Sequence, residues 1–165
     1  MVHEVEKNEE ETTNVTGVYV WPFIDYIRIA KLDSDAVLPD RKHLGDAGLD
    51  FYALNPVVVK PHEVKVIRTG ITMELPPHYF GLIKPKGGSN FDVLSGVVDP
   101  NYQGEILIKV YNPSDDAISF LGGQAVAQVV FIPIIRPDLK LVAENEIHKT
   151  ETYRGETGGI VKYVE

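Results

Sequence analysis

One short segment of this 165-residue chain has the residue types of a reaction site. It runs from Gly96 to Glu105 and reads GVVDPNYQGE. An apolar pair leads into the carboxylate of Asp99, turn-forming residues follow, and the ring of Tyr102 comes shortly after the acid. An acid and a flat ring on a turn between strands could hold a base or a sugar beside an activated water. The same pattern also fits an ordinary β-hairpin turn with a solvated aspartate, so other segments must decide between the two interpretations.

Three further segments carry polar groups in informative settings. Asp50 lies among apolar neighbours after a small-residue turn, where it is either a turn acceptor or a group that orients a metal-bound water. Lys86 and Ser89 belong to the glycine-rich loop PKGGSN, whose N–H groups could cradle phosphate oxygens. Gln128 interrupts an apolar strand, and a half-buried amide either caps backbone groups or binds a ligand.

The C-terminal tail is too rich in glycine for a core element. Arg154 precedes the sequence GETGG, so an arginine stands beside a very flexible backbone. The tail is either a frayed terminus or a mobile flap whose arginine and amides close on phosphates.

Short strands must position these groups. Alternating or β-branched runs separated by turn residues predict an all-β sandwich or barrel. Helical patterns are few: residues 36–42 are interrupted by Pro39, and the best candidate, residues 46–53, is weak. The predicted strands cover residues 26–31, 57–59, 64–68, 71–75, 79–83, 105–111, 117–121 and 126–132.

The chain divides into three parts by composition. Residues 1–25 form an acidic N-terminal arm that we expect to be partly disordered, although its apolar run 18–24 should dock on the body or on a neighbouring subunit. Residues 26–149 form the β domain, and residues 150–165 form the flexible C-terminal flap.

Charge and composition exclude several classes of function. A net charge of −8 argues against direct nucleic-acid binding, but a polyphosphate can still be held locally by amides, a few cations and a metal. The sequence has no cysteine, so disulfides and the cysteine ligands of zinc deaminases are absent. The five histidines lack ligand spacing. Without a bilayer-length apolar run or a signal pattern, we expect an intracellular, cytoplasmic protein that does not bind membranes.

The order of these segments resembles a known family. Segments of the form A-G-x-D, P-(basic)-small-S, G-V-V-D-x-x-Y-x-G-E, G-x-x-x-A-Q and R-G-x-x-G-G occur in this sequence between Tyr26 and Gly159. They are similar to the five ordered motifs of the homotrimeric dUTPases. The resemblance implies a dUTPase-like β-clip, a distorted jelly-roll barrel, which forms a homotrimer. It also implies Mg²⁺-dependent hydrolysis of dUTP to dUMP and pyrophosphate, at sites assembled from motifs of different subunits.

The resemblance also implies roles for the residues of the third motif. Asp99 would be the catalytic base that activates the attacking water. Tyr102 would pack under the deoxyribose, and backbone groups of Gly96, Val97 and Val98 would pair with the uracil edge.

Roles for the other motifs follow from the same resemblance. Asp50 would organise the metal and water side of the site, while Mg²⁺ itself is held through phosphates and water. Lys86, Ser89 and Gln128 would contact phosphates. Arg154 would come from the flap of a third chain.

The second and fifth motifs depart from the family pattern. The loop between Pro85 and Gly96 is shorter than is usual, Lys86 stands where the family has arginine, and Gly87 stands where it has serine. Lysine keeps the charge but loses the bidentate phosphate geometry of arginine. Ile160 occupies the place of the aromatic residue that covers the uracil, and Tyr163 has the wrong spacing to replace it.

Two alternatives remain. The altered motifs leave open a non-catalytic protein of the same fold that binds nucleotide in a regulatory role. A dCTP deaminase is a weaker alternative, because Lys109 stands where those enzymes carry their catalytic glutamate.

Overall fold

The computed structural model describes residues 26–147, and these residues form strands joined by turns and irregular loops. By backbone contacts the chain separates into residues 1–134 and 135–165. Every strand of the described residues lies in the first unit. The strands are β1 (Arg28–Lys31), β2 (Gly48–Tyr52), β3 (Val57–Val59), β4 (Val64–Arg68), β5 (Ile71–Glu74), β6 (Tyr79–Lys84), β7 (Asp92–Val93), β8 (Gly96–Val98), β9 (Leu107–Tyr111), β10 (Ile118–Phe120) and β11 (Ala125–Pro133).

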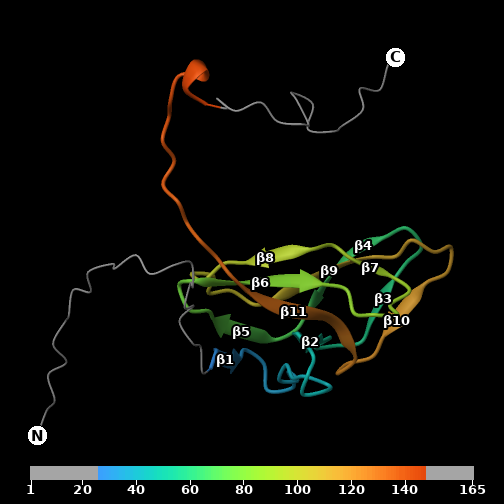
Figure 1. The fold of residues 1–165 in the computed structure, drawn as a ribbon. Coiled ribbons are helices and arrows are strands. Elements are labelled where there is room, and N and C mark those ends of the chain that lie inside the picture. Colours follow the sequence, from blue (N-terminus) through green and yellow to red (C-terminus); the bar gives the residue numbers. More distant parts are fainter. Residues whose placement is uncertain (1–25, 148–165) are drawn as a thin grey trace, which may run out of the picture. The chain divides into compact units, whose positions relative to one another are not determined.

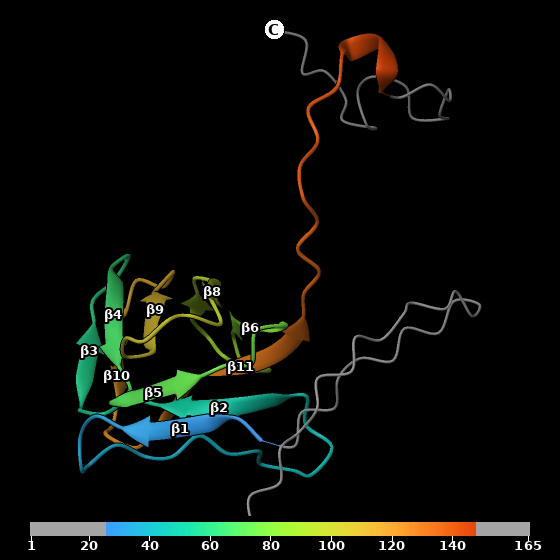
Figure 2. The ribbon, with the colours of Figure 1, turned by 90° about the vertical axis from the view of Figure 1, so that its left-hand side faces the viewer.

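The strands form antiparallel sheets with many crossovers. The largest sheet has the order β2-β11-β6-β8, and a second has the order β4-β9-β7. Two strand pairs, β1-β5 and β3-β10, complete the arrangement. In Figures 1 and 2, β3, β4 and β10 lie together, away from β6 and β11. The expected all-β class is therefore confirmed.

The core consists of the inward-facing residues of these sheets. Phe51 of β2 and Val129 of β11 are fully buried, as is Ile108 of β9, because alternate residues of each strand face the interior. The rings of Phe91 and Phe120 meet edge to face, with centroids 4.9 Å apart. The outward-facing residues of the same strands remain available for polar groups and for contacts with other molecules.

Eight of the strands fall where the sequence predicts them, with ends that differ by at most two residues. The weak helical interpretation of residues 46–53 is wrong, because Gly48–Tyr52 is the strand β2. Its pairing with β11 supplies backbone partners, and Phe51 is drawn into the core, so tertiary contacts override the weak local pattern. The short strands β7 and β8 are also absent from the sequence prediction.

The described part of the second unit, residues 135–147, contains a short 3₁₀ turn, Glu144–Glu146, and no strand. Nowhere in residues 26–147 is there a helix long and apolar enough to cross a membrane. The N-terminal arm and the C-terminal flap lie outside the described residues.

Candidate active site

Three polar residues lie in one row across the large sheet. Gln128 of β11 pairs with Asp50 of β2 on one side and with Lys84 of β6 on the other. Directly opposite residues of antiparallel strands point to the same face, so the three side chains leave the sheet on one side. An acid, an amide and a cation that lie far apart in the sequence therefore share one surface.

The glycine-rich loop is attached to this row by two side chains. The Lys86 ammonium donates to Asp50 Oδ2, and the two side chains are 27% and 14% exposed, so this ion pair is partly withdrawn from water. Gln128 Nε2 donates to the carbonyl of Pro85 at 2.8 Å. Asp50 is therefore not a local turn acceptor, and Gln128 caps backbone. Ser89 remains close in the chain, with its N–H 3.4 Å from the carbonyl of Lys86.

Gly48 makes room for the amide. A Cβ atom on this glycine would lie 2.5 Å from Gln128 Oε1, so any larger residue would displace the side chain that holds the loop. Gly48, the glycine of the A-G-x-D segment, thus has a packing function.

A second acid supports β2 beside Asp50. The Asp50 N–H donates to the carbonyl of Asp40 at 2.8 Å, and the Tyr52 hydroxyl donates to Asp40 Oδ1. Burial, the bond to Asp40 and the negative charges of Asp40 and Asp50 raise the pKa of Tyr52 to about 12. The loop that precedes β2 is therefore bound to this strand at Asp50 and at Tyr52. Sequence analysis missed Asp40 and Tyr52, because their partnership depends on this tertiary contact.

Asp99 lies in a turn directly after the edge strand β8. The Tyr102 N–H donates to the carbonyl of Asp99 at 3.0 Å, which closes the turn. Asp99 is exposed, and no hydrogen bond or ion pair within residues 26–147 occupies its carboxylate. The acid is thus presented to solvent on a defined backbone.

The ring of Tyr102 is held over Gly104. Its hydroxyl donates to the carbonyl of Glu105 at 2.9 Å, and a Cβ on Gly104 would lie 2.5 Å from that hydroxyl. The spacing Y-x-G-E therefore allows the tyrosine to fold back on its own turn.

The side chain of Glu105 fastens this turn to the β4–β5 connection. Glu105 Oε1 accepts the Gly70 N–H at 2.7 Å, and Oε2 lies 3.0 Å from Arg68 Nε. The carboxylate is only 15% exposed, so it is an internal anchor. The sequence analysis assigns Glu105 no role, although its place directly after Gly104 in the motif is an available signal.

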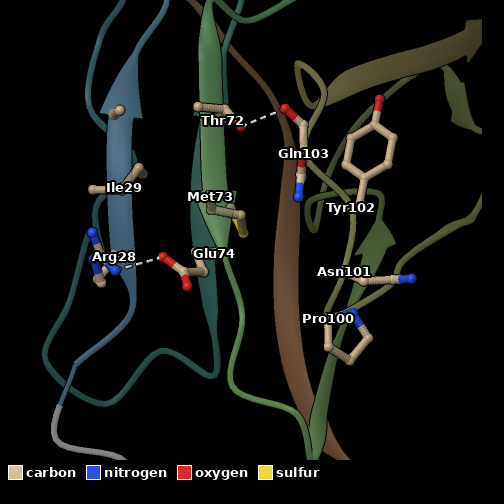
Figure 3. Close-up of a pocket in the computed structure, with 10 residues that line it drawn as sticks. Arg28, Ile29, Thr72, Met73, Glu74, Pro100, Asn101, Tyr102 and Gln103 are labelled. Atoms are coloured by element: carbon tan, nitrogen blue, oxygen red, sulfur yellow. Dashed lines mark hydrogen bonds and ion pairs between the residues drawn. The ribbon is translucent and has the colours of Figure 1, made fainter.

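A pocket of about 570 Å³ lies beside the same turn. Figure 3 shows β1 and β5 on one side, with the ion pair of Arg28 and Glu74, and Pro100 and Asn101 on the other. The pocket therefore borders the backbone that carries Tyr102, but not the row of Asp50 and Gln128.

The two groups of candidate residues are separate within one chain. Asp99 comes directly after Val98, which lies opposite Gly81 of β6. The polar row instead crosses β6 at Lys84, which lies opposite Gln128. These two rows are about 10 Å apart along β6, at about 3.3 Å per residue. Asp50 is also three strands from β8, which adds about 14 Å across the sheet. One chain thus brings Asp50, Lys86 and Gln128 together, with Ser89 further along the same loop, but keeps Asp99 and Tyr102 apart from them.

The sequence profile of the dUTPase family matches residues 34–159. The chain belongs to the dUTPase family. A deoxyuridine 5'-triphosphate nucleotidohydrolase of Picosynechococcus is 34% identical over 140 residues, which cover 81% of this chain and 95% of that protein. Solved structures of phage dUTPases are also similar to this chain.

The dUTPase of Staphylococcus bacteriophage 80alpha, in a mutant form with dUpNHpp, has a TM-score of 0.73 and 26% identity, covering 81% of this chain and 95% of that one. A mutant dUTPase of phage phi11 of S. aureus, described with a structural Mg(II) ion, has a TM-score of 0.69 and 25% identity, covering 73% and 98%. The dUTPase-like fold expected from the sequence is confirmed. The flap with Arg154 lies outside the described residues, so its place relative to either group remains a prediction.

Proposed function

We propose that this dUTPase-family chain hydrolyses dUTP to dUMP and pyrophosphate with Mg²⁺. The observation that carries the proposal is the convergence of Asp50, Lys86 and Gln128 at one end of the large sheet. An acid, a cation and a glycine-rich loop are the groups that a metal-bound triphosphate requires. The related protein from Picosynechococcus is named for the same reaction.

Asp99 is the proposed general base. An exposed carboxylate that no neighbour in residues 26–147 engages can accept a proton from water, and the turn fixes its position. Water so activated would attack a phosphorus of dUTP, and pyrophosphate would leave.

The third motif also supplies recognition of the nucleoside. In the described residues β8 is an edge strand, so Gly96–Val98 have backbone groups that do not pair with β6. Such groups can read the hydrogen-bonding edge of uracil, and cytosine would present the reverse pattern. The ring of Tyr102, held by its bond to Glu105, would pack against the deoxyribose.

The described residues offer a metal few direct ligands. No group of three or more histidines, cysteines or acids within residues 26–147 is arranged to hold an ion. This fits a Mg²⁺ held mainly by the phosphates of the nucleotide and by water, with Asp50 binding one of those waters. When bound, the ion neutralises phosphate charge and polarises the phosphoryl group that reacts.

The separation of Asp99 from Asp50 supports sites that are shared between copies. A base and a metal-organising acid must both reach one triphosphate, and their strands are too far apart in a single chain. A homotrimer solves this if Asp99 and Tyr102 of one copy face Asp50, Lys86 and Gln128 of the next. Arg154 would then close the site from the third copy.

The test is to incubate purified protein and Mg²⁺ with dUTP or dCTP and to measure pyrophosphate and ammonia. Pyrophosphate from dUTP alone is expected, and Asp99→Asn should lower its rate about 100-fold or more. Ammonia from dCTP would show a deaminase instead. Nucleotide binding without either product would show a non-catalytic member of the family.

A further inference from the structure

The Asp50–Lys86 ion pair joins two residues that the proposed phosphate site needs for its ligand and its metal. Lys86 is the cation of the glycine-rich loop, and its ammonium is bound to Asp50 Oδ2 in the chain without nucleotide. The same carboxylate is the group proposed to face the metal. One interaction therefore occupies both residues before any ligand arrives.

The surroundings favour this closed arrangement. The two side chains are 14% and 27% exposed, so water screens the pair less than it screens a surface pair. The bond from Gln128 to the Pro85 carbonyl holds the backbone next to Lys86 in place. Lys84, which is exposed and has no ion-pair partner within residues 26–147, leaves one cation nearby that Asp50 does not neutralise.

A triphosphate without metal should bind weakly at this site. Its oxygens must compete with Asp50 for Lys86, and the released carboxylate would then repel them as a like charge. A metal–triphosphate complex brings a partner for each residue: its oxygens replace Asp50 at Lys86, and the metal's water replaces Lys86 at Asp50.

We propose that the Asp50–Lys86 pair is a lock that a metal–triphosphate opens and a free triphosphate does not, so Lys86 binds phosphate only when the metal is present. This inference rests on the proposed function and concerns the metal dependence of that same site. Lys86 and Asp50 together would make the affinity for nucleotide depend on divalent cation, by thermodynamic coupling through a shared pair.

The test measures binding, not turnover. Calorimetry gives the affinity of the full-length protein for dUpNHpp with Mg²⁺ and with chelator, for the unchanged chain, Asp50→Asn and Lys86→Met. In the unchanged chain Mg²⁺ should raise the affinity about tenfold or more. Lys86→Met should weaken binding about tenfold with Mg²⁺ and clearly less without it, where the unpaired carboxylate of Asp50 adds only its repulsion. Asp50→Asn should raise the metal-free affinity severalfold and reduce the effect of Mg²⁺.

Matched controls remove the same charges elsewhere. Asp116→Asn and Lys60→Met change exposed residues beside β10 and β3, and both should retain the full effect of Mg²⁺. Thermal unfolding verifies that each variant is folded. Equal weakening by Lys86→Met with and without Mg²⁺ would overturn the lock, because Lys86 would then be a constant phosphate ligand. A metal-free affinity of Asp50→Asn that is unchanged or lower would overturn it too.

Inorganic tripolyphosphate separates this inference from the proposed function. If tripolyphosphate shows the metal coupling and its loss in both variants while dUpNHpp does not bind, the lock stands and dUTP is the wrong ligand. If dUpNHpp binds and is coupled to Mg²⁺ equally in all three proteins, the nucleotide site stands and the lock is wrong. If neither compound binds with Mg²⁺, both are wrong.

Discussion

Asp99 and Lys86 lie beyond opposite ends of the β6–β8 strand pair. Asp99 follows the row in which Val98 pairs with Gly81, and Lys86 follows the end of β6 at Lys84. The antiparallel pairing therefore directs the proposed base away from the proposed phosphate ligand of the same chain. This relationship makes cooperation between copies directly testable.

Complementation between two impaired variants should restore activity. Asp99→Asn lacks the base but keeps Lys86, and Lys86→Met has the reverse defect. When the two are co-expressed, random mixing in a closed trimer should make about a quarter of the sites fully native. Pyrophosphate release from dUTP measures the recovery. Mixing each variant only with itself is the control, and a mixture no more active than its components would mean that both residues serve a site within one chain.

Most of the strands could be predicted from sequence, because β-branched runs such as Val64–Arg68 combine strong local preference with clear turn signals. β2 could not, because Gly48 and Asp50 weaken its local signal and its pairing with β11 decides the outcome. Local preference and hydrophobic pattern therefore predict the strands, but not which of them become neighbours.

The site residues show the same limit more clearly. Their types and order could be read from the sequence, which predicts phosphate chemistry near Lys86. The ion pair with Asp50 depends on the order β2-β11-β6, which places residues 36 positions apart side by side. The sequence order does not indicate that Asp99, only 13 residues beyond Lys86, lies beyond the opposite end of the β6–β8 strand pair.

Gly48→Ala should loosen the phosphate loop. The new Cβ would lie 2.5 Å from Gln128 Oε1, so the amide must move and its 2.8 Å bond to the Pro85 carbonyl should be lost. We expect a loss of about 1–3 kcal/mol in the free energy of unfolding and a raised KM for dUTP. Denaturant unfolding and steady-state kinetics measure the two effects. Gly45→Ala is the matched control, because a Cβ there meets nothing within 4 Å, and an equal loss at both positions would refute the packing argument.

The raised pKa of Tyr52 predicts that the free energy of unfolding falls at alkaline pH. Its pKa is raised from 10.0 to about 12, so between these values the folded chain binds a proton that the unfolded chain has released. The stabilisation is therefore complete below about pH 10 and is lost as the pH rises through about 12. Absorbance titration of tyrosinate should lose its latest step in Tyr52→Phe. Tyr26→Phe, which changes a ring that is 74% exposed, should leave that step in place.

Glu105→Gln should destabilise the turn that carries Asp99 and Tyr102. Glu105 accepts the Gly70 N–H at 2.7 Å and pairs with Arg68 at 3.0 Å, and its side chain is only 15% exposed. The amide keeps the shape but removes the charge and one acceptor, so we expect a loss of about 2 kcal/mol in the free energy of unfolding. The Tyr102 hydroxyl bonds to the Glu105 carbonyl, so the affinity for dUTP should fall as well. Glu74→Gln breaks a surface pair whose side chains are 65% and 73% exposed and should cost less than about 1 kcal/mol. If the two variants unfold at the same denaturant concentration, Glu105 is not the anchor of this turn.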